Sequence, residues 1–129
     1  MGSIVGTAVD ASVVIAFEDP DHVFHARATD LIGDAELPLY LSELTLAEVL
    51  VGLEPVEWGT TMRELEEIGF VYCAPKAEDI AQARLDSHLR MPDACVIATA
   101  RAASADTLLS FDAQLLAAAQ SLGFATNEL

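Results

Sequence analysis

The sequence predicts an α/β protein of three layers, α/β/α, in which helices cover both faces of a mostly parallel sheet of four to five strands. One observation behind this prediction is that short apolar runs, typical of buried strands, alternate with longer stretches of helical pattern. Another is that these helices are long enough for right-handed crossovers, which bring successive strands into parallel pairing. The length of 129 residues also suits a single domain spanning 1–129.

The N-terminal part begins with an apolar run over 4–9, which we predict to be a buried strand. An apolar helical turn over 12–17 follows, and the pattern over about 21–32 indicates a helix. Gly33 then suits the position just after a helix end, because glycine adopts the left-handed backbone conformation most readily.

The next part contains a strand over 39–41 and two helices. Ser42 suits the N-cap of a helix that runs to about Leu53, because its hydroxyl can accept a hydrogen bond from a free N–H group of the first turn. Pro55 suits the first turn of the following helix, which ends before Gly69. The apolar stripe of this second helix, expected in the core or on a dimer face, consists of Trp58, Met62, Leu65 and Ile68.

The second half of the chain continues the alternation of apolar runs and helical patterns. Proline begins two of its helices and glycine ends the last one, as is usual at helix termini. The predicted elements are, in chain order, a strand over 70–73, a helix from Pro75 to about Leu89, a helix from Pro92, a strand over 107–111, a helix over 112–122 that Gly123 ends, and a short edge strand over 124–126.

Hydrophobic residues make up 53% of the chain, which excludes a disordered tail or linker. No apolar run approaches the ~18 residues of a membrane span. The first residues carry no basic segment of the kind that opens a secretory signal. Cys73 and Cys95 lie inside apolar runs and are typical of reduced core thiols. We therefore expect a cytoplasmic protein that makes no membrane contact.

The charge of the chain is strongly negative, because 21 acidic and 6 basic side chains give a formal net charge of −15. Such a surface repels polyanions, so the composition lacks the basic footprint of an electrostatic nucleic-acid binder. Two interpretations stay open at this point. The acidic side chains form a solvated face, or some of them bind divalent cations or a basic partner.

Two aspartates directly follow predicted strands. Asp10 comes after the strand over 4–9, and Asp112 comes after the strand over 107–111. The carboxyl ends of parallel strands meet at one edge of a sheet, where ligands bind, so we expect both carboxylates there. Each aspartate also suits a helix N-cap, which is the alternative interpretation.

Two further carboxylates are predicted to join them. Asp93 lies in the first helical turn after Pro92, where the helix dipole favours a negative charge and already offers a structural explanation. Glu48 shares a helix face with Leu44 and Val51, and an isolated charge among apolar side chains is costly unless it is paired or binds a metal. Converging carboxylates require a cation, and oxygen ligands favour Mg²⁺ or Mn²⁺. The chemistry implied is metal-assisted hydrolysis of a phosphodiester.

Three segments carry a resemblance to a known family. They are VDASVVIAFEDPDHVFHARA around Asp10, SELTLAEVLVG around Glu48, and MPDACVIATARAASADTLLSFDAQL around Asp93 and Asp112. In the order and spacing of their acids these segments resemble the PIN-domain ribonucleases, and most closely the VapC-type toxins of bacterial toxin–antitoxin pairs. The resemblance extends over nearly the whole chain. The last segment is the most specific, because it combines two acids, a helix and a strand in family-like spacing.

The resemblance implies a PIN-like fold and a Mg²⁺-dependent endoribonuclease, with Mn²⁺ as a possible substitute, that hydrolyses RNA with a metal-activated water. It further implies a homodimer and a cognate antitoxin protein that inhibits the toxin by covering the groove of the active site. The strong acidity departs from this expectation, because few cations remain to hold RNA. By this resemblance the catalytic and metal-binding acids are Asp10, Glu48, Asp93 and Asp112, supported by the hydroxyls of Ser110 and Ser12.

Other acid-based sites disagree with particular residues. A phosphatase of the haloacid-dehalogenase type needs a second acid two positions after its nucleophile, where this chain has Ser12. A von Willebrand-type metal site needs a serine where this chain has Val14. A receiver domain needs an early acidic pair and a late lysine, whereas the only lysine is Lys76. The remaining alternative is a PIN-like protein-binding module that cleaves poorly or not at all.

The histidines receive structural interpretations. His22 and His25 have the spacing H-x-x-H, but no third ligand is evident, so we expect surface or packing roles for both. His88 is expected on the surface of a helix. The basic residues are scattered along the chain and form no cluster in the sequence.

Overall fold

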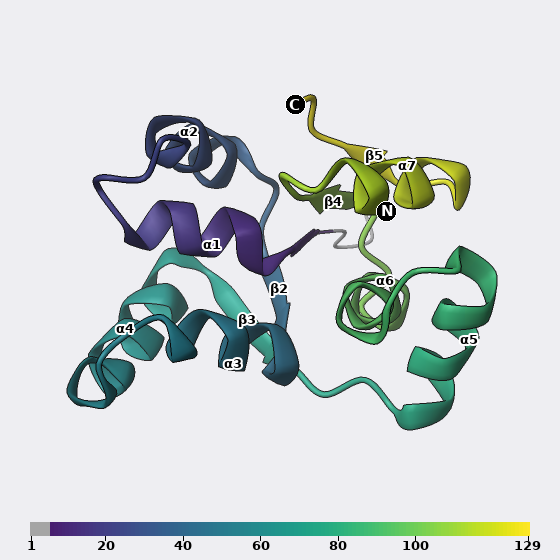
Figure 1. Cartoon of the computed structure of the whole chain (residues 1–129), viewed down its shortest axis with the longest axis horizontal. Helices are drawn as coiled ribbons and strands as arrows, with labels where there is room; N and C mark the ends of the chain where they lie inside the picture. Colours follow the sequence, from purple (N-terminus) through teal and green to yellow (C-terminus); the bar gives the residue numbers. More distant parts are fainter. Residues whose placement is uncertain (1–5) are drawn as a thin grey trace, which may run out of the picture.

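The computed structural model describes residues 6–129 and contains one sheet of five parallel strands in the order β3-β2-β1-β4-β5 (Figure 1). The predicted three-layer α/β/α class is confirmed. Residues 4 and 5 of the first predicted strand lie outside the described residues. The strands are β1 (Thr7–Val9), β2 (Leu39–Ser42), β3 (Phe70–Cys73), β4 (Thr107–Leu109) and β5 (Ala125–Thr126).

Helices cover both faces of the sheet (Figure 1). One core lies under the first four helices and a second core lies under the last three. The first four are α1 (Ala11–Glu18), α2 (His25–Asp34), α3 (Glu43–Val51) and α4 (Pro55–Ile68). The last three are α5 (Ala77–Ser87), α6 (Met91–Ala102) and α7 (Ala113–Ser121).

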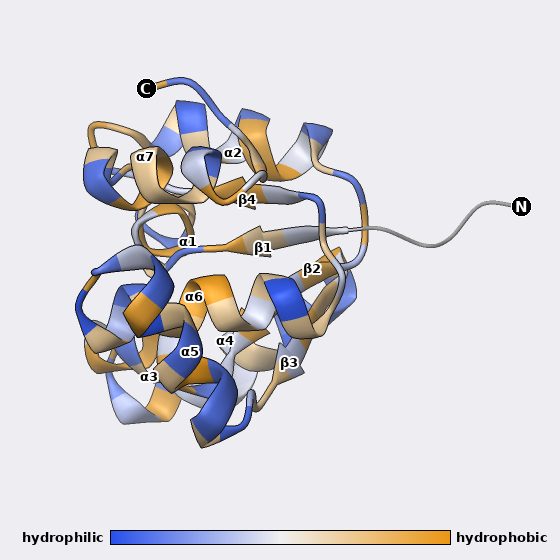
Figure 2. Cartoon of the chain, turned by 90° about the vertical axis from the view of Figure 1, so that its right-hand side faces the viewer, coloured by the Kyte–Doolittle hydropathy of each residue, from blue (hydrophilic) through white to orange (hydrophobic). Residues whose placement is uncertain are grey.

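Side chains along the central strands alternate between the two cores, as the pleat of a strand requires. Val9 and Leu109 belong to the core under α1–α4, whereas Ala8 and Leu108 belong to the core under α5–α7. Figure 2 shows the apolar colour of α6, whose residues 94–100 are all buried. Because both faces of the sheet are buried, polar side chains that can act on a ligand are confined to the strand ends.

Local sequence signals set the ends of α3 and α4. Ser42 caps α3, because its Oγ accepts a hydrogen bond from the N–H of Thr45 at 3.0 Å. Pro55 begins α4, and Gly69 ends it with a φ of +126°. A side chain at Gly69 would be strained in this conformation, and its Cβ would lie 2.9 Å from Cδ2 of Leu37. The predicted signals at Ser42, Pro55 and Gly69 are therefore confirmed.

Two residues near helix ends differ from the prediction. Gly33 lies inside α2, and the helix ends in extended backbone at Ala35 rather than in a left-handed residue. His88, which was predicted on a helix surface, instead follows α5 in the left-handed conformation with a φ of +61°. Residues other than glycine adopt this conformation uncommonly, so the helical pattern does not reveal it.

Helix α2 begins at His25, later than predicted, because the segment before it forms turns. In that segment His22 Nδ1 accepts a hydrogen bond from the N–H of Phe24 at 3.0 Å. His25 Nδ1 lies 2.9 Å from the carbonyl oxygen of Ala16 in α1. Both histidines therefore contact local backbone groups and help to fix the connection between α1 and α2.

The apolar stripe of α4 lies only partly in the core. Leu65 is fully buried, whereas Trp58 and Ile68 are each 37% exposed. The indole N–H of Trp58 donates to the carbonyl oxygens of Leu50 at 2.8 Å and Leu53 at 3.3 Å. Trp58 therefore fixes the turn between α3 and α4 rather than filling the core.

Both cysteines are free thiols, but only one is a core residue. Cys95 is buried in α6, as predicted. Cys73 is half-buried at the end of β3, so the core prediction is wrong for this residue. Among the helices of residues 6–129, none is long and apolar enough to cross a membrane.

Candidate active site

The parallel register brings the ends of β1 and β4 together at one edge of the sheet. Val9 pairs with Leu109, so the residues that follow them, Asp10 and Ser110, are neighbours. The N–H of Asp10 donates to the carbonyl of Leu109 at 2.9 Å, which continues the hydrogen-bond ladder past the strand end. Asp10 is 7% exposed and Ser110 is fully buried. A carboxylate so deeply buried must accept hydrogen bonds or bind a cation.

Two serine hydroxyls bind the same oxygen of Asp10. Ser12 Oγ and Ser110 Oγ each donate to Oδ2 at 2.8 Å. Each hydroxyl also accepts a backbone N–H. Ser12 Oγ accepts that of Phe111 at 3.0 Å, and Ser110 Oγ accepts that of Asp112 at 2.9 Å. From residues 6–129 no hydrogen bond reaches Oδ1 of Asp10, which leaves this oxygen available to a ligand.

Asp10 and Asp112 both precede a helix but use their carboxylates differently. Asp112 Oδ1 accepts hydrogen bonds from the N–H groups of Gln114 at 2.8 Å and Leu115 at 3.3 Å. Asp112 therefore caps α7, in agreement with the alternative interpretation of this residue. Asp10 occupies the N-cap position of α1 without any side-chain capping bond. Two serine hydroxyls, one of them from Ser12 in α1, hold the carboxylate of Asp10 in place of backbone N–H groups of the helix.

Glu48 lies on a solvent-exposed face of α3, and the prediction that it stands among buried apolar side chains is wrong. Its neighbours Leu44 and Val51 are 45% and 81% exposed. The pKa of Glu48 is nevertheless raised, mainly by partial burial and then by the negative charges of Asp10 and Asp93. The charges of Asp10 and Asp93 therefore act on Glu48 in addition to its partial burial.

Asp93 lies in the first turn of α6 and interacts with the same group of charges. Its pKa is raised, mainly by partial burial and then by the charges of Asp10 and Asp112, while the Arg90 guanidinium acts in the opposite direction. Repulsion from Asp10 therefore reaches both Glu48 and Asp93, and repulsion from Asp112 reaches Asp93. A cation placed among them would relieve this repulsion.

The chemistry of this acidic group suits a hard divalent cation, because all of its donors are carboxylate oxygens. Within the described range 6–129, no three His, Cys, Asp or Glu side chains stand close enough together to hold a metal ion between them. Asp10 already presents a free oxygen from a fixed position, whereas Glu48 is an exposed side chain on a helix. For one ion to contact several of these carboxylates, exposed side chains such as Glu48 would have to rotate toward Asp10. The donor set therefore fits Mg²⁺ or Mn²⁺, and the four acids remain the predicted ligands.

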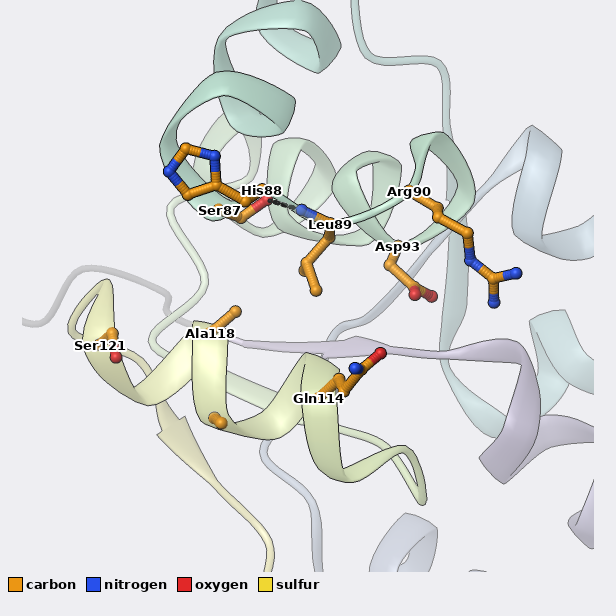
Figure 3. A pocket seen from close by; sticks show the side chains of 9 residues that line it. Ser87, His88, Leu89, Arg90, Asp93, Gln114, Ala118 and Ser121 are labelled. Carbon is orange, nitrogen blue, oxygen red and sulfur yellow. Dashed lines mark hydrogen bonds between the residues drawn. The ribbon is translucent and has the colours of Figure 1, made fainter.

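A cleft of about 470 Å³ adjoins Asp93 (Figure 3). One wall is the turn between α5 and α6, and the other is α7. In Figure 3 the side chains of Asp93 and Gln114 point into the space between α6 and α7 from opposite sides. The cleft is lined by Ser87, His88, Leu89, Arg90, Asp93, Gln114, Ala117, Ala118 and Ser121.

Comparison with protein families identifies this arrangement. The sequence matches the family described as the PIN domain over residues 7–121. The chain belongs to the PIN-domain family. The match spans all four predicted acids and confirms the resemblance found in the three sequence segments. A comparison with curated proteins found no match.

Solved structures share the PIN fold with this chain. VapC20 from Mycobacterium tuberculosis, described as a toxin that cleaves the sarcin–ricin loop, superposes with a TM-score of 0.70 at 20% identity over 87% of this chain and 94% of VapC20. FitAcB from Neisseria gonorrhoeae has a TM-score of 0.64 at 21% identity over 95% of this chain and 96% of its own. PAE2754 from Pyrobaculum aerophilum has a TM-score of 0.60 at 21% identity over 98% and 92%, respectively. At this level of identity the likeness establishes the common fold.

One residue of the site lies beyond the part that matches the PIN family and was not predicted. The side chain of Asn127 accepts the N–H of Ser110 at 2.8 Å and donates to the carbonyl of Ser110 at 2.9 Å. The register of β4 and β5 pairs Leu108 with Thr126, so Asn127 follows directly beside the end of β4. The sequence predicted an edge strand over 124–126, but only the pairing of this strand with β4 brings Asn127 beside Ser110.

Proposed function

We propose that this PIN domain is a metal-dependent endoribonuclease and acts as the toxin of a toxin–antitoxin pair. The observation that supports the proposal most directly is the state of Asp10. Its Oδ2 is fixed by two serine hydroxyls at 2.8 Å, and its Oδ1 accepts no hydrogen bond from the described residues 6–129. Burial, and after it the charge of this carboxylate, raises the pKa of both Glu48 and Asp93. Such an arrangement is costly unless a cation binds to it.

The described side chains divide the work of such a site. Asp10 is the central ligand, because its position is fixed by the strand ladder and by Ser12 and Ser110. Asp93 and Glu48 approach from α6 and α3 and would complete the coordination of Mg²⁺ or Mn²⁺. When bound, such an ion polarises the phosphodiester and lowers the pKa of the attacking water. The serines keep the free oxygen of Asp10 in one direction, as hydrogen-bonding partners of metal ligands commonly do.

The proposed partners are RNA as substrate and an antitoxin protein as inhibitor, in a bacterial cytoplasm. VapC20, which shares the fold, is described as a toxin that cleaves an RNA loop. FitAB, another protein with this fold, is described as bound to a DNA fragment. The net charge of −15 favours a cationic protein segment over RNA as the partner that is attracted from a distance.

We also propose that the protein forms a homodimer. Several large apolar side chains remain exposed on the helices over the first core, among them Ile15 at 40%, Val51 at 81% and Val56 at 89%. These side chains are the apolar surface that a second copy of the chain would cover. Light scattering at micromolar concentration is expected to give about twice the chain mass of 13.7 kDa. A mass of one chain at every concentration would contradict the dimer.

The nuclease activity is tested with purified protein, Mg²⁺ or Mn²⁺, and single-stranded RNA. Asp10→Asn and Asp93→Asn keep the shape of the side chain and remove its charge, so each is expected to abolish cleavage while circular dichroism shows a folded domain. Asp30→Asn removes an exposed charge from α2, away from the site, and serves as the matched control. Full cleavage by Asp10→Asn, or by the wild type in excess EDTA, would contradict the proposed function.

A second candidate function is a PIN-like binding module without efficient cleavage. It is favoured by one observation: in the described part of the chain, no three potential ligands are already placed to share a metal ion. Isothermal titration with Mn²⁺ separates the two functions. Stoichiometric binding that Asp10→Asn removes supports the nuclease. If the protein binds no Mn²⁺ but still binds a partner protein, the result supports the binding module.

A further inference from the structure

Apart from Asp93, the residues that line the cleft between the α5–α6 turn and α7 have no role in the chemistry described so far. We infer that the cleft holds the nucleotide next to the scissile phosphate of a single-stranded RNA, with Gln114 contacting the base and Arg90 contacting the phosphate backbone. The inference rests on the proposed nuclease function and adds to it the source of base selectivity. It follows from the position, shape and lining of the cleft.

The position of the cleft links it to the carboxylates. Asp93 is one of its lining residues, so a chain held among the acids continues into this space (Figure 3). Its volume of about 470 Å³ lies within the range of ~300–1,000 Å³ that is typical of sites for small ligands. A nucleotide is of this size class, whereas a folded protein segment requires a longer groove.

The lining is mostly polar, with six polar or charged residues beside three apolar ones, which are Leu89, Ala117 and Ala118. Leu89 is buried at the base of one wall, and Ala117 and Ala118 of α7 lie on the other. Gln114 and Ser121 contribute polar groups from the two ends of α7. An unstacked base can bury its face on such a surface and use its edge for hydrogen bonds, which is how sequence is read in single-stranded RNA.

Gln114 is the side chain best placed to read a base. Its backbone N–H is bound to Asp112 Oδ1 at 2.8 Å, so the root of the side chain is fixed beside a predicted metal ligand. From the rest of residues 6–129, no hydrogen bond reaches its side-chain amide. A primary amide offers both donors and an acceptor, and therefore distinguishes base edges that differ in their own donors and acceptors.

The wall opposite Gln114 is preformed. Ser87 Oγ donates to the carbonyl of Ala83 at 2.7 Å and accepts the N–H of Leu89 at 3.2 Å. The N–H of His88 binds the carbonyl of Arg84 at 2.9 Å, which holds the left-handed residue in place. This turn leads directly to Arg90, so the cation is carried by a rigid segment. A preformed wall lowers the entropic cost of ordering a ligand against it.

Arg90 is the cation that the cleft offers to a phosphate. Two other arginines are engaged elsewhere: Arg101 forms an ion pair with Asp86 at 2.8 Å, and Arg27 donates to the carbonyl of Glu128 at 3.0 Å. Arg90 lines the cleft together with Asp93. In a chain of net charge −15, a single cation at this point adds a local attraction for a phosphate close to the acids.

The first test measures base selectivity with the active protein and a pool of random single-stranded RNA whose cleavage sites are sequenced. Gln114→Ala is expected to reduce the preference at one position next to the cleaved bond by about two- to tenfold, the worth of one hydrogen bond. Gln120→Ala, in the same helix but outside the cleft, is the matched control and keeps the wild-type preference. Identical preferences for the two variants would overturn the role of Gln114.

The second test measures binding without cleavage, by fluorescence anisotropy of a labelled RNA oligomer in the Asp10→Asn background. Arg90→Ala is expected to reduce the slope of log affinity against log salt by about 0.7, as for the loss of one phosphate contact to a single strand. Arg84→Ala removes an exposed cation outside the cleft and is expected to leave the slope unchanged. An equal slope for both variants would overturn the role of Arg90. If the wild type cleaves RNA while both tests give equal results, only this inference fails; if it cleaves no RNA, the proposed function fails with it.

Discussion

The side-chain amide of Asn127 pairs with both backbone polar groups of Ser110, accepting its N–H at 2.8 Å and donating to its carbonyl at 2.9 Å. A neighbouring strand would make the same two hydrogen bonds with the backbone of Ser110. Ser110 in turn donates to Asp10 and accepts the N–H of Asp112. One side chain beside the last strand therefore fixes the residue that joins two of the predicted metal ligands.

Asn127→Ala is expected to weaken both the fold and the site. It leaves the buried backbone of Ser110 without its partners, which costs about 1–3 kcal/mol for each unsatisfied group before water compensates. Urea unfolding measures the loss. Gln120→Ala, which breaks only the exposed bond from Gln120 Nε2 to Thr126 Oγ1, is the control and should change stability little. Equal stability of the two variants would show that water replaces Asn127 without cost.

Ser110→Ala and Ser12→Ala are expected to lower metal affinity more than they lower stability. Each removes one hydroxyl from Asp10 Oδ2, so the carboxylate loses a fixed direction. Loss of such a hydrogen bond commonly reduces metal affinity or activity by about 10–100-fold. Titration calorimetry with Mn²⁺ measures the affinity. Unchanged affinity in both variants would mean that the strand ladder alone positions Asp10.

The sequence is informative about the ends of strands and less informative about the faces of helices. Asp10 and Asp112 could be predicted at one edge of the sheet because each follows an apolar run. The exposure of Leu44 and Val51 could not be predicted, because α3 carries apolar residues on every side and periodicity then identifies no inner face.

Contacts between distant parts of the chain also escaped the sequence pattern. The serines were predicted beside Asp10, whereas Asn127 was not, since its role depends on the pairing of β5 with β4. The left-handed conformation of His88 likewise depends on how the α5–α6 turn closes, and a helical pattern does not encode it. The features that were not predicted depend on strand order and turn geometry, which residue types alone do not reveal.

Asp93→Asn is expected to stabilise the metal-free protein at neutral pH. The folded-state pKa of Asp93 is raised above 3.8, mainly by burial and then by Asp10 and Asp112. Its contribution to stability is therefore present below pH 3.8 and is lost as the pH rises through the folded-state pKa. The variant should melt above the wild type at pH 7 in EDTA, and the two should converge in acid. A lower melting temperature at pH 7 would mean that the dipole of α6 outweighs the repulsion.

Adding Mn²⁺ is expected to make the wild type melt at a higher temperature than Asp93→Asn. An ion bound only to the folded state stabilises it, and it does so more strongly in the wild type, which keeps all its carboxylates. Because the ion competes with protons for Glu48 and Asp93, whose pKa values are raised, its effect should weaken as the pH falls. Thermal melts with and without Mn²⁺ at two pH values measure the effect. Asp30→Asn should respond to Mn²⁺ as the wild type does.

Tyr72→Phe is expected to change how stability depends on alkaline pH. Burial, followed by the charges of Glu66, Glu43 and Glu18, raises the pKa of Tyr72 to about 12. Its hydroxyl donates to the carbonyl of Met62 at 2.6 Å. Between pH 10 and about 12 the unfolded state ionises first, so the wild type loses stability there and the phenylalanine variant does not. The stability gap between the two proteins, measured by urea unfolding, should narrow over this range; a constant gap would contradict the expected ionisation.

The proposed antitoxin is expected to bind through a basic segment that places an arginine or lysine among the four acids. Burial, and after it repulsion between the carboxylates, raises the pKa of Glu48 and Asp93. Such a cation relieves the repulsion, and it excludes the metal ion from the same place. Complex formation should therefore weaken with added salt and with added Mg²⁺. Affinity that is indifferent to both, or a toxin-binding segment of net negative charge, would contradict this account.

The hydrogen bond from Ser110 to Asp10 spans 100 positions of the chain. During synthesis on the ribosome, Asp10 and Ser12 emerge long before the partners that complete their arrangement. The nascent chain therefore holds an acidic segment without the geometry of a nuclease until residues 107–127 have joined the sheet. The proposed nuclease would therefore stay inactive while its own messenger RNA is being translated. The same order of events makes closure of β4 onto β1 a late step of folding.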